Sequence, residues 1–203
     1  MKALLLPSYF PSVSTFAAMA QASEIVLETE DNFQKQTNRN RMYIYSPNGI
    51  QLLNIPVKHT KEAHQKTKDI KLETAFDWQK QHFKSLEAAY RSSPFFEYFE
   101  DDIMPIFEKK HTFLMDLNLQ SMEIASKCLG LNLSYSKTEE YFKEIKDAND
   151  YRHFANGKKD FSEFEPYPQV FEEKNGFLNN LSILDLLFNE GRHALDYLKQ
   201  QKL

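Results

Sequence analysis

The chain has few of the residues that mark several common protein classes. Its 203 residues include a single cysteine, Cys128, so no disulfide can form within the chain. This cysteine lies in an apolar helical pattern, which predicts a reduced, cytoplasmic setting. Only five glycines are present, against 17 phenylalanines and 10 tyrosines, and this balance argues for a packed fold rather than a disordered chain.

Long apolar runs and a strong net charge are missing as well. The apolar start is interrupted by Pro7 and is too short to cross a membrane, so we expect a buried first strand and no integral membrane segment. The 25 basic and 29 acidic side chains give a formal net charge of −4 and are spread along the chain. This distribution provides no broad positive field, so we expect no nucleic-acid partner.

Recognisable catalytic and metal motifs are also absent from the sequence. It contains no Walker-type phosphate loop, no dinucleotide-binding glycine pattern, no HExxH zinc motif and no cysteine-rich metal pattern. His59 and His64 are five residues apart, which misses the spacing of a helical metal pair. We therefore expect no metal site, and the sequence assigns neither a cofactor nor an oligomeric state.

The order of the patterns that are present predicts an α/β fold. Residues 2–6 and 24–28 are apolar, strand-like runs on either side of a helix that ends near Gln21, which is the minimal parallel crossover. Residues 42–57 carry a hairpin pattern around Pro47-Asn48-Gly49. We expect one domain over residues 1–203, with a small, mainly parallel sheet that starts with a β-α-β unit, an inserted β-hairpin and a mostly helical second half.

The second half contains further predicted elements. Residues 59–68 predict a mobile loop, and Trp78 to Tyr90 has a helical stripe. Apolar periodicity predicts helices over residues 119–129, 138–146, 180–188 and 192–200, and the first of these has Asn118 as its cap and Gly130 as its stop. We expect a strand over residues 132–136 and irregular chain over residues 150–168.

A polar, cationic segment at residues 32–41 lies between two strand-like stretches. If it is extended, period-2 geometry places on one face the residues Lys35, Thr37, Arg39 and Arg41. The two guanidinium groups, about 7 Å apart, could then clamp a phosphate or diphosphate. The alternative is a solvated edge strand whose charges discourage pairing with other chains. We take Lys35, Arg39 and Arg41 as candidate substrate-binding residues.

Tyr9 lies where the first strand ends, and open α/β sheets bind ligands outside the carboxyl ends of their strands. Backbone amides there, together with a helix starting near Ser12, could receive a phosphate. The alternative is an ordinary turn between a strand and a helix. Tyr9 is therefore a further candidate substrate-binding residue.

Two titratable residues lie within apolar helical patterns. His82 shares a stripe with Trp78 and Leu86, and it fits either a general base or a hydrogen-bonded core histidine. Asp185 has leucines on both sides and needs a cation or donors, so it fits either a substrate-facing base or a structural ion pair. We take His82 and Asp185 as candidate catalytic residues and leave the structural alternatives open.

Several motifs, in order along nearly the whole chain, resemble one family. They are Tyr9-Phe10-Pro11, Gln34-Lys35-Gln36 with Asn40-Arg41, Asn48-Gly49, Ile55-Pro56-Val57, Trp78 with His82, Tyr90 and residues 93–96, and residues 180–191. In this order they are similar to the WbqC-like proteins of bacteria. Many members of that family carry glutamine before the first proline, where this chain has Leu6-Pro7.

The resemblance implies a role in the biosynthesis of surface polysaccharide such as O-antigen, without a catalytic assignment. Together with the cationic segment it suggests a transferase-like enzyme that acts on a small-molecule substrate, a nucleotide-activated or carrier-linked sugar. Arg39 and Arg41 would hold phosphate, His82 would act as acid or base, and Asp185 would orient a polar partner. The alternative is a non-catalytic binding or scaffold protein that docks an acidic partner. An enzyme would bring Tyr9, Arg41, His82 and Asp185 to one cleft.

Overall fold

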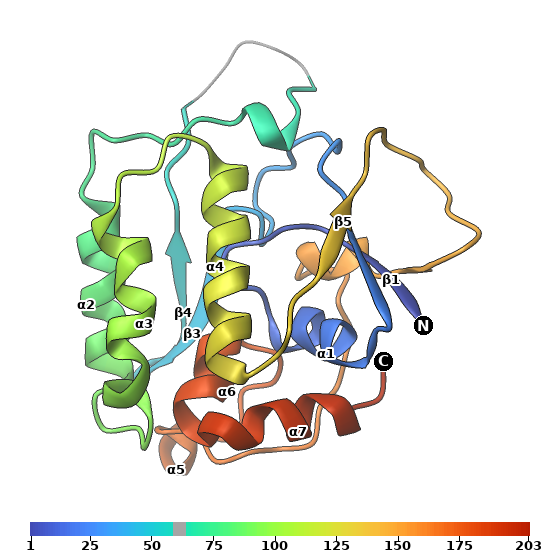
Figure 1. Ribbon diagram of the computed structural model, residues 1–203. Helices are drawn as coiled ribbons and strands as arrows, with labels where there is room; N and C mark the ends of the chain where they lie inside the picture. The colour runs from blue at the N-terminus through green and yellow to red at the C-terminus, as the bar shows by residue number, and fades with distance from the viewer. Residues whose placement is uncertain (59–63) are drawn as a thin grey trace.

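A four-stranded parallel sheet forms one side of the molecule (Figure 1). The computed structural model describes residues 1–58 and 64–203. The strands β1 (Lys2–Leu5), β2 (Glu24–Leu27), β5 (Tyr135–Lys137) and β6 (Asn149–Asp150) lie in the order β5-β2-β1-β6. Ala3 pairs with Ile25 on one side and with Asn149 on the other. The helix α1 (Val13–Gln21) connects β1 to β2, so the predicted β-α-β start is confirmed.

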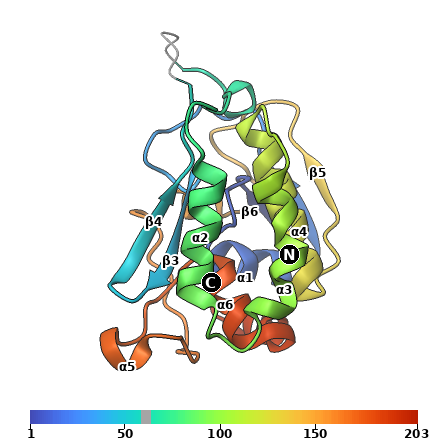
Figure 2. The ribbon, with the colours of Figure 1, turned by 90° about the vertical axis from the view of Figure 1, so that its left-hand side faces the viewer.

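An antiparallel hairpin forms a separate two-stranded sheet. Its strands β3 (Arg41–Ser46) and β4 (Gly49–Asn54) are joined by the two-residue turn that the sequence predicts at Pro47-Asn48. Gly49 has a φ of 95°, a conformation that favours glycine at the end of this turn. Figure 2 shows α2 (Trp78–Tyr90) between this hairpin and the pair α3 (Phe96–Glu108) and α4 (Leu114–Leu129).

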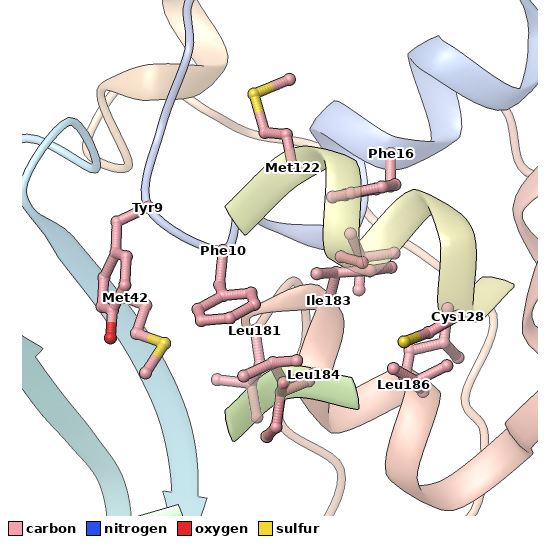
Figure 3. Packing of buried hydrophobic residues seen from close by; sticks show 14 of the residues in the cluster. Tyr9, Phe10, Phe16, Met42, Met122, Cys128, Leu181, Ile183, Leu184 and Leu186 are labelled. Carbon is pink, nitrogen blue, oxygen red and sulfur yellow. The ribbon is translucent and has the colours of Figure 1, made fainter. Parts of the chain in front are cut away.

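The rest of the chain is mostly helical, and α4 lies near the centre of the molecule (Figure 1). The later helices are α5 (Glu172–Asn175), α6 (Ile183–Glu190) and α7 (Ala194–Gln200), with 3₁₀ turns at 67–69, 152–155 and 191–193. Figure 3 shows part of the core, to which the loop after β1 contributes Phe10, α4 contributes Met122 and α6 contributes Leu184. The α/β class, the hairpin and the helical second half are thus confirmed. No helix in the described part of the chain has the length and apolarity that a membrane crossing requires.

The structure differs from four of the sequence predictions. The helix α4 begins at Leu114, so Asn118 lies inside it instead of capping it. The fully buried Asn118 amide donates hydrogen bonds to the carbonyls of Pro7 (3.2 Å) and Arg39 (2.8 Å), which ties two loops to the helix. Residues 138–146 form no helix, and the adjacent strand is Tyr135–Lys137 instead of 132–136. The strand β6 and a 3₁₀ turn lie at the start of the segment predicted as irregular.

The cationic segment is not a strand before Arg41. Residues 35–40 form turns and bends, and Gln36 has a positive φ of 61°. The predicted row of Lys35, Thr37, Arg39 and Arg41 therefore does not form, because alternation holds only in extended chain. Within the predicted mobile loop, residues 59–63, which include His59, lie outside the described residues, and His64 is exposed.

Candidate functional site

A cavity of about 450 Å³ lies at the carboxyl edge of the parallel sheet. The chain moves from β1 to β2 and β5 on one side and then places β6 on the other side of β1. The strand order therefore reverses between β1 and β6. At such a switch point the two neighbouring connections leave in opposite directions and open a crevice, where α/β proteins bind ligands.

Residues that follow all four parallel strands line this cavity, which we call the sheet-edge pocket. Its lining comprises Leu6 after β1, Asp31, Asn32, Gln34 and Arg39 after β2, Tyr141 and Lys143 after β5, and Asp150, Arg152, His153, Asn156 and Lys159 from β6 onward. Four cationic side chains and two carboxylates are among them. The sheet-edge pocket thus combines the expected location of an α/β ligand site with local positive charge.

Arg152 organises one side of the sheet-edge pocket. Its guanidinium forms a bidentate ion pair with Asp150, with Nη2–Oδ2 at 2.6 Å and Nε–Oδ1 at 2.9 Å, and it approaches the buried carboxylate of Glu28 at 3.5 Å. Burial raises the pKa of Asp150, but hydrogen bonds from Arg152 outweigh it and lower the pKa below its ordinary value. Arg152 also donates to the carbonyls of Phe142 and Lys143, at 2.7 and 3.1 Å. These bonds hold the loop that follows β5 beside the sheet.

Arg39 and Asp31 form the opposite side. Both Nε and Nη2 of Arg39 lie 2.8 Å from Oδ2 of Asp31, and Nη1 donates to the Thr37 hydroxyl at 3.2 Å. Arg39 is only 3% exposed. Burial raises the pKa of the Asp31 carboxyl, and the nearby Arg39 charge does not fully offset this effect. A carboxyl in a pocket that binds its proton more tightly than usual is a candidate acid or base.

Lys143, Lys159 and His153 supply the groups of the sheet-edge pocket that are available to a ligand. All three residues are exposed, and their side chains make no hydrogen bond with any residue in the described ranges 1–58 and 64–203. The His153 ring lies 4.5 Å from the Phe154 ring. The two lysines can therefore bind an anion, and His153 can exchange a proton with it, without breaking a contact of the fold.

His82 lies in the core and not in the sheet-edge pocket. It is 4% exposed, with Nδ1 at 3.1 Å from the Tyr9 hydroxyl and Nε2 at 3.2 Å from the carbonyl of Asn54. Nε2 donates to that carbonyl and Nδ1 accepts from Tyr9, so one neutral tautomer satisfies both bonds. Burial lowers the pKa of His82 to about 4. The fully buried Tyr9 thus binds a histidine, and its predicted contact with substrate stays a prediction.

Asp185 is also enclosed by the fold. It is 0% exposed and accepts hydrogen bonds from the hydroxyls of Tyr90 and Tyr167, both at 2.7 Å, and from the Gln169 amide at 2.8 Å. We call these four residues the Asp185 hub. Burial raises the pKa of Asp185 although these bonds favour the carboxylate. The catalytic roles of Asp185 and His82 stay predictions, and their surroundings are those of architectural groups.

Lys35 and Arg41 line cavities other than the sheet-edge pocket. Both border a cavity of about 480 Å³ beside β4. Arg41 also borders a cavity of about 340 Å³, which we call the amide pocket because its lining includes Gln36, Asn38, Asn179 and Asn180. The turns at 35–40 separate Arg39 from Arg41, so the predicted two-arginine clamp does not form. Tyr9, Arg41, His82 and Asp185 do not meet in one cleft.

The turn after β1 is already hydrogen-bonded within the protein. The amides of Tyr9 and Phe10 donate to the carbonyl of Asn38 (3.2 Å) and the hydroxyl of Ser121 (3.1 Å). At the start of α1 the amide of Val13 donates to the Leu181 carbonyl, and that of Ser14 donates to the Asn180 side chain, both at 3.0 Å. The predicted phosphate site at this helix is therefore wrong, because its donors are occupied.

Sequence reasoning found Arg39 but missed the other main residues of the sheet-edge pocket. Arg152, His153 and Lys159 come after β6, a two-residue polar strand without an apolar pattern. These residues could have been found only from the rule that the carboxyl ends of parallel strands meet at one edge of a sheet. Using this rule requires the order of the strands, which the sequence does not give. Among residues 1–58 and 64–203 no cluster of three or more His, Cys, Asp or Glu side chains is arranged to hold a metal ion.

Comparisons with known proteins show the family of this chain. A protein described as "Uncharacterized protein Rv1507c" from Mycobacterium tuberculosis (strain ATCC 25618 / H37Rv) is 26% identical over an alignment of 229 residues, gaps included. The alignment covers 97% of this chain and 96% of that protein. No solved structure matches the chain. The model of the WbqC-like protein family matches residues 7–155, a range that includes all strands after β1 and most of the sheet-edge pocket. The chain belongs to the WbqC-like protein family.

Proposed function

We propose that this chain acts in the biosynthesis of bacterial surface polysaccharide of the O-antigen type, in the cytoplasm, as a transferase-like protein. Its substrate is a nucleotide-activated or carrier-linked sugar, whose phosphates bind in the sheet-edge pocket. The observation that carries the proposal is the convergence of four parallel strand ends on a cavity with two exposed lysines that no described residue bonds. Membership of the WbqC-like family supports the pathway.

The residues of the sheet-edge pocket suggest a division of roles. Lys143 and Lys159 bind the phosphate oxygens, and Arg152 adds positive charge while it fixes the loop after β5. Arg39, which the sequence suggested as a substrate-binding residue, acts in this proposal mainly by holding Asp31. His153 and Asp31 are the groups that can move a proton to or from the bound sugar. In this proposal they take the place that the sequence suggested for His82 and Asp185.

Binding of uridine diphosphate and of its sugar conjugates, measured by titration calorimetry, tests the proposal. The double variant Lys143→Gln/Lys159→Gln should weaken binding about tenfold, which corresponds to about 1.4 kcal/mol. The double variant Lys35→Gln/Lys80→Gln is a matched control, since it removes the same charge from two exposed lysines outside the sheet-edge pocket and should leave the affinity within about twofold. Equal losses in both variants would contradict the proposed site.

Arg39→Gln is unsuitable as a test of binding. It removes a cation of the sheet-edge pocket and also leaves the buried Asp31 carboxylate without its ion-pair partner. Breaking such a buried pair typically costs about 3 to 5 kcal/mol, so lost binding would not be separable from lost folding. The exposed lysines avoid this difficulty.

A second candidate function is a non-catalytic binding or scaffold protein that docks an acidic partner. The observation in its favour is that His82 and Asp185 are buried among satisfied hydrogen bonds, apart from Arg41. The same calorimetry separates the two functions. A scaffold would bind an acidic polypeptide such as polyglutamate through Lys143 and Lys159 and would not distinguish a nucleotide sugar from free phosphate.

A further inference from the structure

The amide pocket adjoins the sheet-edge pocket and shares two segments of chain with it. Gln34 and Arg39 line the sheet-edge pocket, whereas Gln36 and Asn38 of the same turn segment line the amide pocket. Residues 156–160 are divided between the two cavities in the same way. Asn38 joins the segments, because its amide nitrogen donates to the Ala155 carbonyl at 2.7 Å. The same two hydrogen-bonded segments of chain therefore line both cavities.

The chemistry of the two cavities differs. Cations and carboxylates dominate the sheet-edge pocket, whereas the amide pocket is lined mainly by uncharged polar side chains and the ring of Tyr43. Amide and hydroxyl groups both donate and accept hydrogen bonds, as the hydroxyls of a sugar do. The volume of about 340 Å³ is within the range of small-ligand sites. This lining complements a neutral, polyhydroxylated ligand.

Asp160 is the carboxylate of the amide pocket, whose lining also includes the cations Arg41 and Lys158. Its Oδ1 accepts from the amide and hydroxyl of Ser162, at 3.1 and 2.7 Å. Its Oδ2 accepts from the hydroxyl of Ser14 at 2.6 Å and from the Asn180 side chain at 2.7 Å. These bonds fix a negative charge in the wall of the pocket, which offsets one of its two cations, so the amide pocket is less cationic than the sheet-edge pocket with its four cations and two carboxylates.

Three side chains of the amide pocket keep hydrogen-bonding capacity for a ligand. Gln36 is exposed, and within the described ranges its amide group has no hydrogen-bond partner, nor does the hydroxyl of Tyr43. Arg41 uses only its Nε, which donates to Asn54 at 3.2 Å, and no other described residue bonds its guanidinium. Polar groups that converge on a cavity and have no protein partner are the groups that orient a ligand.

We infer that the amide pocket is a second binding site, which takes an uncharged sugar unit and is distinct from the anion site in the sheet-edge pocket. Binding of the neutral sugar follows from the lining of the pocket alone. That this sugar belongs to the polysaccharide under assembly rests on the proposed function. Gln36, Arg41 and Tyr43 contact the sugar.

Saturation-transfer NMR of the full chain tests the inference. The probes are the methyl glycosides of glucose, galactose, mannose and N-acetylglucosamine at millimolar concentration, with and without saturating uridine diphosphate. At least one glycoside should bind, and the nucleotide should not displace it. The variant Gln36→Asn/Tyr43→Phe should reduce glycoside binding at least fivefold, since it shortens the amide and removes the hydroxyl, and asparagine tolerates the positive φ of residue 36. Lys35→Gln, at the adjacent position, is the control and should bind as the unmodified chain does.

Arg41→Gln is a second variant in case the double variant is unstable, and it should also weaken glycoside binding. The inference is overturned if none of the four glycosides binds, if the nucleotide displaces the bound glycoside, or if the folded variants bind as tightly as the unmodified chain. If nucleotide binding is absent while glycoside binding responds to the variants, the second site stands and the proposed function fails.

Discussion

The Asp185 hub and the sheet-edge pocket both gather carboxylates and hydrogen-bond donors, but they differ in how fully these groups are satisfied. In the hub, the carboxylate of Asp185 is fully buried and accepts from three side chains. In the sheet-edge pocket, Lys143, Lys159 and His153 are exposed, and no described residue accepts a hydrogen bond from their side chains. Saturated buried groups define a fold, whereas unsaturated groups beside a cavity can bind a ligand.

The largest effect expected from this comparison is the loss of stability in Asp185→Ala. The substitution leaves Tyr90, Tyr167 and Gln169 without their acceptor, and each buried donor left unpaired costs about 1 to 3 kcal/mol. We expect the free energy of unfolding to fall by roughly 4 kcal/mol in urea titrations. A loss below about 1 kcal/mol, with nucleotide binding abolished, would instead make Asp185 a functional residue.

His82 should make stability depend on pH. Its pKa is about 4 in the folded chain, against 6.5 for an exposed histidine. Between these values the unfolded chain binds a proton that the folded chain does not, so stability falls as pH drops from about 6.5 to 4. The expected loss is about 3 kcal/mol, from a pKa difference of about 2.5.

Comparison of the unmodified chain with His82→Gln isolates this contribution. The raised pKa values of Asp31 and Asp185 act on stability with the opposite sign, and both chains contain these residues. Urea titrations at pH 4.5 and 7 should show a smaller pH-dependent difference in the variant. Identical pH dependence in both chains would contradict a neutral, buried His82.

Sequence patterns predicted the parts of the fold that rest on local apolar order. The β1-α1-β2 unit and the hairpin have continuous apolar runs and a turn that requires glycine, so their signals are local. The strand β6 is a two-residue polar pair, Asn149-Asp150, that pairs because β1 lies beside it. Residues 138–146 look helical, but Arg152 takes the carbonyl of Phe142, which in a helix over 138–146 would accept from the amide of Lys146.

The location of the candidate site could be predicted better than its residues. The carboxyl edge of the sheet followed from the strand–helix–strand start, and Arg39 does line the pocket there. Lys143, Arg152 and Lys159 could not be found, because they become neighbours only through the reversal of strand order between β1 and β6. The row of charges in the sequence also suggested Arg41 as a site residue, but the turns at 35–40 place Arg41 beside two other cavities.

The Arg152 side chain links the parallel sheet to the loop after β5, and Arg152→Lys should lower stability by an intermediate amount. Lysine keeps the charge but cannot bond Asp150 in the bidentate geometry and also reach the carbonyls of Phe142 and Lys143. We expect the free energy of unfolding to fall by about 2 kcal/mol and trypsin to cleave the loosened loop faster after Lys143. Unchanged cleavage in this loop would mean that Arg152 does not hold it.

The smallest expected effect is the response of nucleotide binding to salt. Lys143 and Lys159 are exposed, so their attraction to phosphate is screened, and binding of uridine diphosphate should weaken about threefold to fivefold between about 0.05 and 0.5 M NaCl. Lys159→Gln should reduce this salt dependence as well as the affinity, because one of the screened charges is gone. Lys35→Gln should leave the salt dependence unchanged, since that lysine borders another cavity. If both variants changed the salt dependence equally, nucleotide binding would respond to the overall charge of the protein. The difference between the saturated Asp185 hub and the sheet-edge pocket would then not show where the nucleotide binds.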